Sequence, residues 1–354
     1  MNLRTPNEPA IYRIRTLVCL IVLTAQRQDL KNRMRKTLFF LAKVAITAAM
    51  LYFAVGRVNF GAIEDRLSRL DPAWIAAGLV AVAVQTLLLA MRWQAIVIAC
   101  GTTLPLRLSY GFMMISIFFG QVLPTTVGGD AVRVWLLARR DSSWSAATYS
   151  VLIDRFIGVL GLAVMVIVCL PWSLALIQNP IGRSALLLIG CGSIAAALAF
   201  LLLGTIPSPF LQRFWAVRHL MNLAVTVRTL LASTTGPRTM LLSLLSHVLT
   251  STIAWCAAHA AATPFEFAHS LLLIPPIMLI STVPISIAGW GVRETALIVA
   301  FGYAGLQAAD ALVVSILFGA AMFVFGVAGG GLWLLSGAKL KIPAAPPEEL
   351  LASS

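Results

Sequence analysis

The chain has 354 residues, of which 60% are hydrophobic and only 11% are charged, and its mean hydropathy is +0.92. Soluble globular chains carry about 25% charged residues, so this composition excludes a soluble enzyme, a disordered chain and a nucleic-acid-binding protein. The net charge of +13 fits basic cytoplasmic loops better than a nucleic-acid partner. Several apolar runs reach the ~20 residues of a membrane-spanning helix, so an all-α polytopic membrane protein is expected.

The N-terminal segment, residues 1–36, is basic and is predicted to be a cytoplasmic tail, with Met34 as an alternative translation start. A transmembrane domain is predicted over 37–336 and a polar cytoplasmic C-terminal tail over 337–354. Simple apolar segments that each predict one crossing, about six in all, lie at 37–55, 73–91, 146–170, 185–203, 240–262 and 308–336.

Two further apolar stretches, 108–139 and 268–304, are interrupted. A continuous helix over the first would run about 48 Å, against roughly 30 Å of hydrocarbon core. Clusters of Pro and Gly, which break helices, interrupt them at 124–130 (PTTVGGD) and 284–291 (PISIAGWG). Each stretch is therefore predicted to form two half-length helices that enter and leave the membrane on one side, as a re-entrant hairpin.

Residues 204–239 differ from these segments, because aromatic residues interleave with arginines in the pattern of an amphipathic interfacial helix. With both termini inside, six crossings and two hairpins place most Lys and Arg on the cytoplasmic side. Arg92 and Trp93 follow the 73–91 segment and are predicted to lie at the membrane interface.

The two interrupted stretches are similar in sequence. VLPTTVGGDAVRVWLL (122–137) and TVPISIAGWGVRETALIV (282–299) each place Pro, small residues, two Gly and then an Arg at the head of the second half-helix. They enter from opposite faces in the predicted topology, and such inverted repeats with broken helices are typical of secondary transporters. Two unrelated Gly–Pro kinks are the alternative.

Each predicted hairpin has the chemistry of an anion site. A half-helix N-terminus presents unpaired N–H groups, glycine permits close approach, and arginine offers a planar fork for phosphate. The predicted substrate-binding residues are Gly128, Gly129, Arg133, Gly289, Gly291 and Arg293. Charges in a membrane mark functional groups or ion pairs, so ion coupling or charge balance is assigned to Asp130, Asp154, Arg155 and Glu294.

Motifs of catalysis and metal binding are missing from the sequence. There is no GxSxG, HExxH or P-loop motif, and the Cys and His residues lack metal-ligand spacing. No enzyme activity, cofactor or metal is therefore expected. Ser243 and His247 lie four apart on one helix face and are interpreted as a polar helix–helix contact rather than a nucleophile and its base.

Three motifs in chain order resemble the lysylphosphatidylglycerol synthase transmembrane-domain family. They are QVLPTTVGGDAVRVWLLARR (121–140), VLIDRFIGVLGL with its Asp154-Arg155 pair, and VPISIAGWGVRE (283–294). The resemblance covers about residues 37–336 and implies a flippase-like lipid translocase, or a membrane partner of lipid or polyprenyl-linked sugar metabolism. A standalone membrane module without the soluble aminoacyl-transferase domain of fused members is expected.

The sequence thus predicts a multi-pass protein of the bacterial inner membrane that moves or binds an anionic lipid, such as a phospholipid, a polyprenyl phosphate or a hopanoid-pathway lipid. One alternative is a non-transporting accessory subunit of lipid or glycolipid biosynthesis, and another is an intramembrane lipid-modifying enzyme. Expected partners are the lipid and lipid-biosynthesis enzymes, without nucleic acid. The sequence leaves open the lipid, the direction, the driving ion and the oligomeric state.

Overall fold

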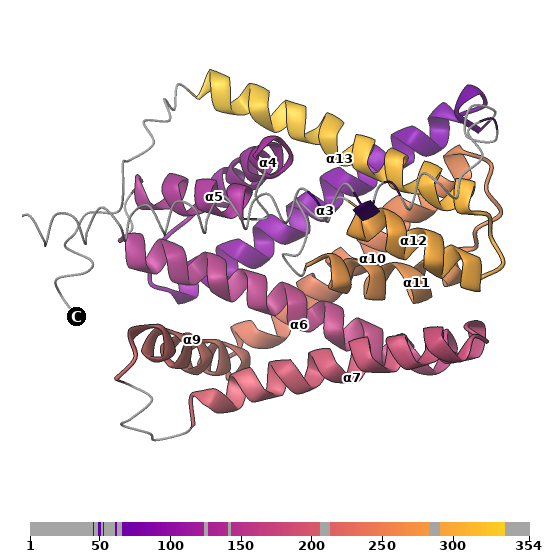
Figure 1. The fold of residues 1–354 in the computed structure, drawn as a ribbon. Helices are drawn as coiled ribbons and strands as arrows, with labels where there is room; N and C mark the ends of the chain where they lie inside the picture. Colours follow the sequence, from indigo (N-terminus) through magenta and orange to yellow (C-terminus); the bar gives the residue numbers. More distant parts are fainter. Residues whose placement is uncertain are drawn as a thin grey trace, which may run out of the picture.

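The computed structural model describes residues 66–123, 127–140, 143–205, 213–282 and 291–336, together with positions 45, 49, 50, 52 and 61. Regular structure in this part of the chain is entirely helical, which confirms the all-α polytopic fold class (Figure 1). The helices are α3 (Pro72–Ala99), α4 (Leu106–Val122), α5 (Gly128–Ala138), α6 (Trp144–Leu176), α7 (Pro180–Leu203), α9 (Trp215–Ala232), α10 (Thr235–Ala260), α11 (Phe267–Ser281), α12 (Val292–Tyr303) and α13 (Ala308–Leu335).

Within the described residues, five helices are long and apolar enough to cross a membrane: α3, α6, α7, α10 and α13. They correspond to five of the six simple segments predicted from the sequence. The sixth, 37–55, lies mostly outside the described residues, as do both predicted tails and Gly289. The structure therefore has a helix of membrane-spanning length and apolarity at each of these five segments.

Local sequence signals start three of these spans. Asp71 accepts the Ala73 N–H at 2.8 Å, and Ser143 accepts the Ala146 N–H at 3.1 Å. Asn179 accepts the N–H groups of Ile181 and Gly182 at the start of α7. Such side chains satisfy backbone N–H groups that have no partner inside the helix, so they fix where each span begins.

Both interrupted stretches form pairs of half-length helices, as predicted. The α5 helix runs back along α4, because Arg133 Nη1 lies 3.9 Å from Met113 Sδ while Gly129 lies against Ser116, nearer the break. The α12 helix likewise runs back along α11, since the rings of Phe265 and Phe301 lie 4.7 Å apart. Both stretches are helical hairpins; their re-entrant placement in a membrane and their inverted repeat stay predictions.

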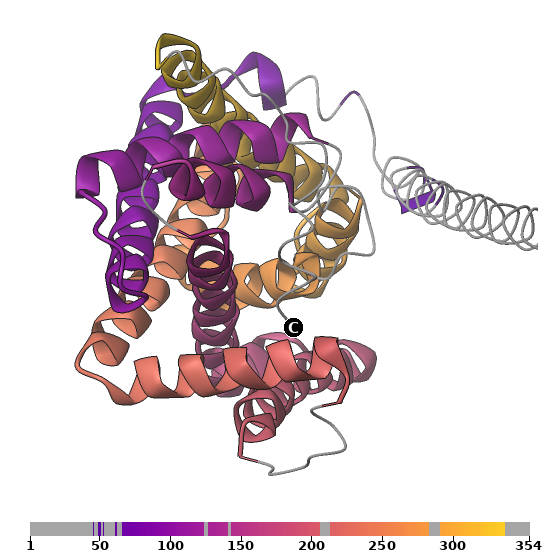
Figure 2. The same ribbon diagram turned by 90° about the vertical axis from the view of Figure 1, so that its left-hand side faces the viewer.

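Two glycines allow α4 to pack closely between its neighbours. A Cβ atom on Gly129 of α5 would collide with the carbonyl oxygen of Ser116, and one on Gly329 of α13 would collide with that of Met114. Both carbonyls belong to α4, so its backbone is approached closely from two helices (Figure 2). Small residues permit this close approach of backbones in membrane helix bundles.

The centre of the bundle and its edge have different chemistry. The largest apolar cluster joins α10, α11, α12 and α13, and α3 lies along α10. At the edge, α9 buries one face, formed by Met221, Ala224, Val227 and Leu230, and exposes Arg218 and Arg228. An amphipathic helix within 204–239 is therefore confirmed, while its position at a membrane interface stays a prediction.

Candidate functional site

The most heavily charged buried site of the described residues centres on Asp154, in the first half of α6. Its Oδ1 accepts a hydrogen bond from Arg92 Nε of α3, and its Oδ2 accepts one from Arg133 Nη1 of α5, both at 2.8 Å. The side chains of all three residues are at most 6% exposed. One carboxylate thus holds three helices together through charge-assisted hydrogen bonds.

A second aspartate extends this chain of charges. Asp130 lies one turn before Arg133 on α5 and accepts from Arg133 Nη2 at 2.5 Å. Its other oxygen accepts from Arg155 Nε of α6. The five residues Arg92, Asp154, Arg133, Asp130 and Arg155 form what we call the ion network. The side chain of Arg155 is 52% exposed, against 10% or less for the other four.

Two sequence predictions at this site were wrong. Arg92 and Trp93 were placed at the membrane interface, but they are 5% and 0% exposed. Asp154 supplies the charge that keeps Arg92 inside the bundle, and the guanidinium of Arg133 lies 5.2 Å from the centre of the Trp93 ring. The α3 helix consequently continues to Ala99 instead of ending near residue 91.

A separate charged cluster lies at the start of α12. Glu294 Oε1 accepts from Arg293 Nη2 and from Ser315 Oγ of α13, each at 2.8 Å, and Oε2 accepts the Gly291 N–H at 2.6 Å. Gly291 has φ +85°, a left-handed conformation that favours glycine. Glu294 therefore caps α12 and binds it to α13.

Replacing Glu294 with glutamine is expected to lower the free energy of unfolding by about 1–3 kcal/mol. Glutamine keeps the shape of the side chain but removes the buried negative charge that accepts these hydrogen bonds. Denaturation with sodium dodecyl sulfate, followed by tryptophan fluorescence, measures the change. Glu266→Gln is the matched control, since Glu266 is exposed just before α11. Equal stability of the two variants would contradict a structural role for the Glu294 charge.

The structure separates the predicted site residues into two groups. Asp130, Arg133, Asp154 and Arg155 meet in the ion network, whereas Arg293, Glu294 and Gly291 form the α12 cluster. The helices that carry Arg133 and Arg293, α5 and α12, lie at different ends of the bundle in Figure 1. Each hairpin therefore has its own charged cluster.

The glycines of the first hairpin lie inside the bundle. Gly128 and Gly129 start α5 and are buried. The side of Gly129 on which a Cβ would stand faces the α4 backbone at Ser116, so this glycine is needed for helix packing. A role of either glycine in binding a ligand stays a prediction.

Sequence analysis missed Arg92 as a member of the ion network. The available signal was the position of Arg92, because the helical apolar pattern of 73–91 continues beyond it through Ile96 and Val97. An arginine placed one turn or more inside such a pattern needs an acidic partner, and Asp154 was an acid inside another predicted span.

Ser243 and His247 have the contacts expected of helix–helix packing. Ser243 Oγ donates to the carbonyl oxygen of Ile157 at 3.2 Å and accepts from Arg92 Nη1 at 3.1 Å. His247 Nε2 lies 2.8 Å from the carbonyl oxygen of Gly158. Both side chains thus join α10 to α6, which confirms the interpretation made from the sequence.

Membrane-length helices, two helical hairpins and a buried ion network together define a polytopic α-helical membrane protein. The family model described as lysylphosphatidylglycerol synthase TM region matches residues 40–330. The chain belongs to this family, and the three motifs that predicted the resemblance all lie within the matched range. A search of the curated proteins gave no significant match.

Proposed function

We propose that this protein is a flippase-like transporter that moves an anionic lipid across the bacterial inner membrane. Membership of a family linked to lipid handling supports the proposal. The observation that carries it is the ion network, because a broken-helix hairpin contributes two of its charges inside a membrane-spanning bundle. Broken helices and intramembrane charges together are typical of transport sites.

Burial of the charged side chains of the ion network costs desolvation free energy, and helix packing does not require charged residues at these positions. Apolar residues of similar volume often replace a buried ion pair without loss of stability, or with a gain. Five charges in one place therefore suggest a function for at least some of them. Arg155 is the member best placed to meet a ligand, because its side chain is half exposed.

The proposed binding step is an exchange of partners at Arg155. A guanidinium has five N–H donors, so Arg155 can hold a lipid phosphate while its Nε contact to Asp130 weakens. Asp130 keeps its bond to Arg133. The ion network has three guanidinium groups and two carboxylates, so one negative charge on a bound phosphate brings its net charge from +1 to zero. Proton coupling through Asp130, whose contact to Arg155 weakens in this exchange, is part of the proposal.

The finer features of the proposal follow the charge pattern of the sequence. Both termini are placed in the cytoplasm, with the two hairpins entering from opposite faces. Candidate substrates are a phospholipid, a polyprenyl phosphate or a hopanoid-pathway lipid, all of which the phosphate chemistry above would accommodate if they carry that group. Lipid-biosynthesis enzymes are the proposed protein partners.

A liposome assay tests the proposal. Fluorescent phosphatidylglycerol in the inner leaflet is measured as it becomes accessible to an added quencher, with and without a pH gradient. Wild-type protein is expected to accelerate this movement, and Arg155→Gln to slow it about tenfold, since a charge-assisted hydrogen bond contributes about 1.5–3 kcal/mol. Arg107→Gln is the matched control, because Arg107 is exposed at the start of α4.

The outcomes separate the three functions. No acceleration by the wild type under any gradient would overturn transport and favour the accessory subunit. A change in the mass of the lipid would favour the lipid-modifying enzyme. Equal slowing by Arg155→Gln and Arg107→Gln would show that Arg155 has no specific role in binding the lipid.

A further inference from the structure

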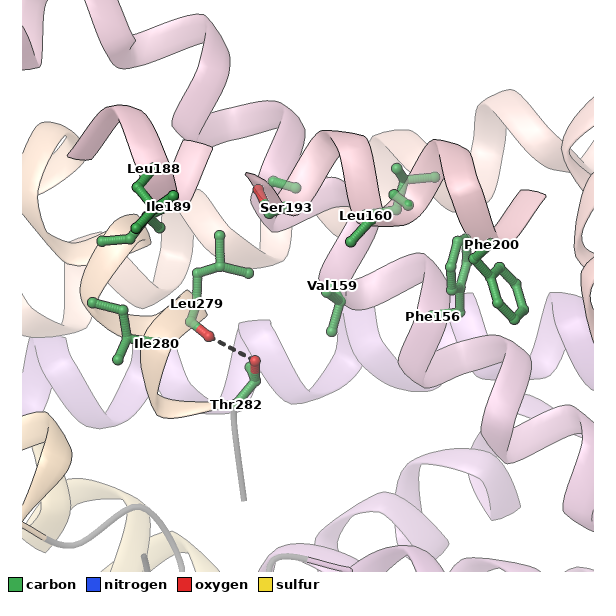
Figure 3. A pocket seen from close by; sticks show the side chains of 13 residues that line it. Phe156, Val159, Leu160, Leu188, Ile189, Ser193, Phe200, Leu279, Ile280 and Thr282 are labelled. Carbon is green, nitrogen blue, oxygen red and sulfur yellow. Dashed lines mark hydrogen bonds between the residues drawn. The ribbon is translucent and has the colours of Figure 1, made fainter. Parts of the chain in front are cut away.

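A cavity of about 480 Å³ lies between α6 and α7 and is bounded at one end by the last residues of α11 (Figure 3). Phe156 and Val159 of α6 and Ala197 and Phe200 of α7 line it. Leu279 of α11 and Thr282, the residue after α11, lie away from the Phe156 and Phe200 end. The size falls in the usual range of small-molecule sites. We call it the α6–α7 groove.

The chemistry of the α6–α7 groove fits a hydrocarbon. Only two of its lining side chains carry a polar atom, and both hydroxyls are used by their own helices. Ser193 Oγ donates to the Gly190 carbonyl at 2.8 Å, and Thr282 Oγ1 donates to that of Leu279 at 2.6 Å. Apolar cavities of this kind stay dry, so the occupant must be apolar along its length.

The length of the groove matches one leaflet of a membrane. Its lining residues on α7 run from Leu188 to Phe200, a rise of about 18 Å at 1.5 Å per residue. Half of the roughly 30 Å hydrocarbon core is about 15 Å. Both α6 and α7 are candidate membrane spans, and only 17% of the most apolar window of α7 is buried inside the protein. The groove therefore opens where lipid chains lie.

Phe156, at one end of the groove, is next in the chain to a positively charged residue, Arg155. Phe156 and Phe200 meet there with their ring centres 4.5 Å apart, one turn before α7 ends at Leu203. Arg155 precedes Phe156 and lies one helical turn from Val159, on the same side of α6. Its side chain is half exposed and its Nε donates to Asp130 of α5. Pairing with a lipid headgroup at the groove therefore needs the guanidinium to turn away from Asp130.

We propose that the α6–α7 groove holds one acyl chain of an anionic phospholipid whose headgroup pairs with Arg155. This inference rests on the proposed function and adds where the lipid tail would lie. Apolar walls select the tail, and the guanidinium selects the charge of the headgroup.

Photo-crosslinking tests the groove directly. Full-length protein is placed in nanodiscs with phosphatidylglycerol that carries a diazirine in one acyl chain, and labelled residues are mapped by mass spectrometry. Labelling of the groove residues is expected to saturate as the probe fraction rises. Labelling of Leu198, on the exposed side of α7, is expected to rise linearly, as for bulk lipid.

A matched pair of variants controls for the folding of α7. Ala197 lines the groove and Ala195 is exposed outside it. Ala197→Trp is expected to reduce saturable labelling at least fivefold, while Ala195→Trp leaves it unchanged. Phosphatidylglycerol should compete with the probe, phosphatidylcholine should not, and Arg155→Gln should abolish that difference.

Each other outcome contradicts a stated part of the proposal. Linear labelling at every position, or no effect of Ala197→Trp, overturns the acyl-chain site. Equal competition by both lipids overturns the pairing with Arg155, and crosslinks between two copies assign the groove to a dimer. If groove labelling saturates but liposomes show no lipid movement, the transport proposal fails while the acyl-chain site stands; the reverse result removes the site alone.

Discussion

Replacing Asp154 with alanine is expected to lower the free energy of unfolding by about 3–5 kcal/mol, the cost of removing one partner from a buried ion pair. Asp154 is the acidic partner of Arg92 in the part of the chain that the structure describes, and Arg133 pairs with both Asp154 and Asp130. Removal of Asp154 leaves one guanidinium without a counter-charge inside the bundle and weakens the pairing of a second.

The same detergent titration measures this effect, with Glu266→Ala as the control for loss of an acidic side chain. Glu266 is exposed and its side chain makes no capping bond, so the control should change stability by less than about 0.5 kcal/mol. A loss below about 1 kcal/mol in the Asp154 variant would mean that water reaches both arginines, which would contradict their burial.

Gly329→Ala is expected to cost about 1–3 kcal/mol or more, because overpacking a close contact forces the backbone to shift. The added methyl group would meet the carbonyl oxygen of Met114, which belongs to the backbone of α4 and has no rotamer with which to move away. Separation of α13 from α4 should follow. A disulfide-trapping or cysteine-accessibility measurement at the α4–α13 contact would detect the separation alongside the loss of stability.

Gly331→Ala provides the matched control two residues along the same helix. A Cβ atom at Gly331 meets nothing within 4 Å. The substitution should therefore be neutral or stabilise α13, by up to about 1 kcal/mol, because alanine favours a helix more than glycine does. Similar losses in the two variants would show that glycine flexibility, rather than the close contact with α4, explains the effect.

Much of the fold could be predicted from the sequence, because membrane spans and helix breaks are local signals. The apolar runs gave the spans, and the Pro–Gly clusters at 124–130 and 284–291 gave the ends of α4 and α11 correctly. The pattern of 204–239 also gave an amphipathic helix there, but the aromatic residues on which it rested, Phe214 and Trp215, are exposed, and α9 buries other residues. Helix existence in a membrane depends on length and apolarity, which one sequence displays.

The grouping of the charges could be predicted only in part. Asp130 and Arg133 are one turn apart, and their pairing follows from helix geometry. The pairing of Arg92 with Asp154 joins residues 62 positions apart, and the rule that places arginines at membrane edges predicted the opposite location. Gly129 was interpreted from its chemistry alone, since the approach of Ser116 depends on how α5 folds back along α4.

The α13 helix gives the two hairpins a mechanical connection. Ser315 joins α13 to Glu294 and Arg293 of the second hairpin, and Gly329 joins it to α4 of the first. These contacts are about 21 Å apart along one continuous helix. Because α13 is a stiff rod between them, it cannot slide or tilt at one hairpin without altering its seat on the other, and the two halves of the bundle must adjust their positions together.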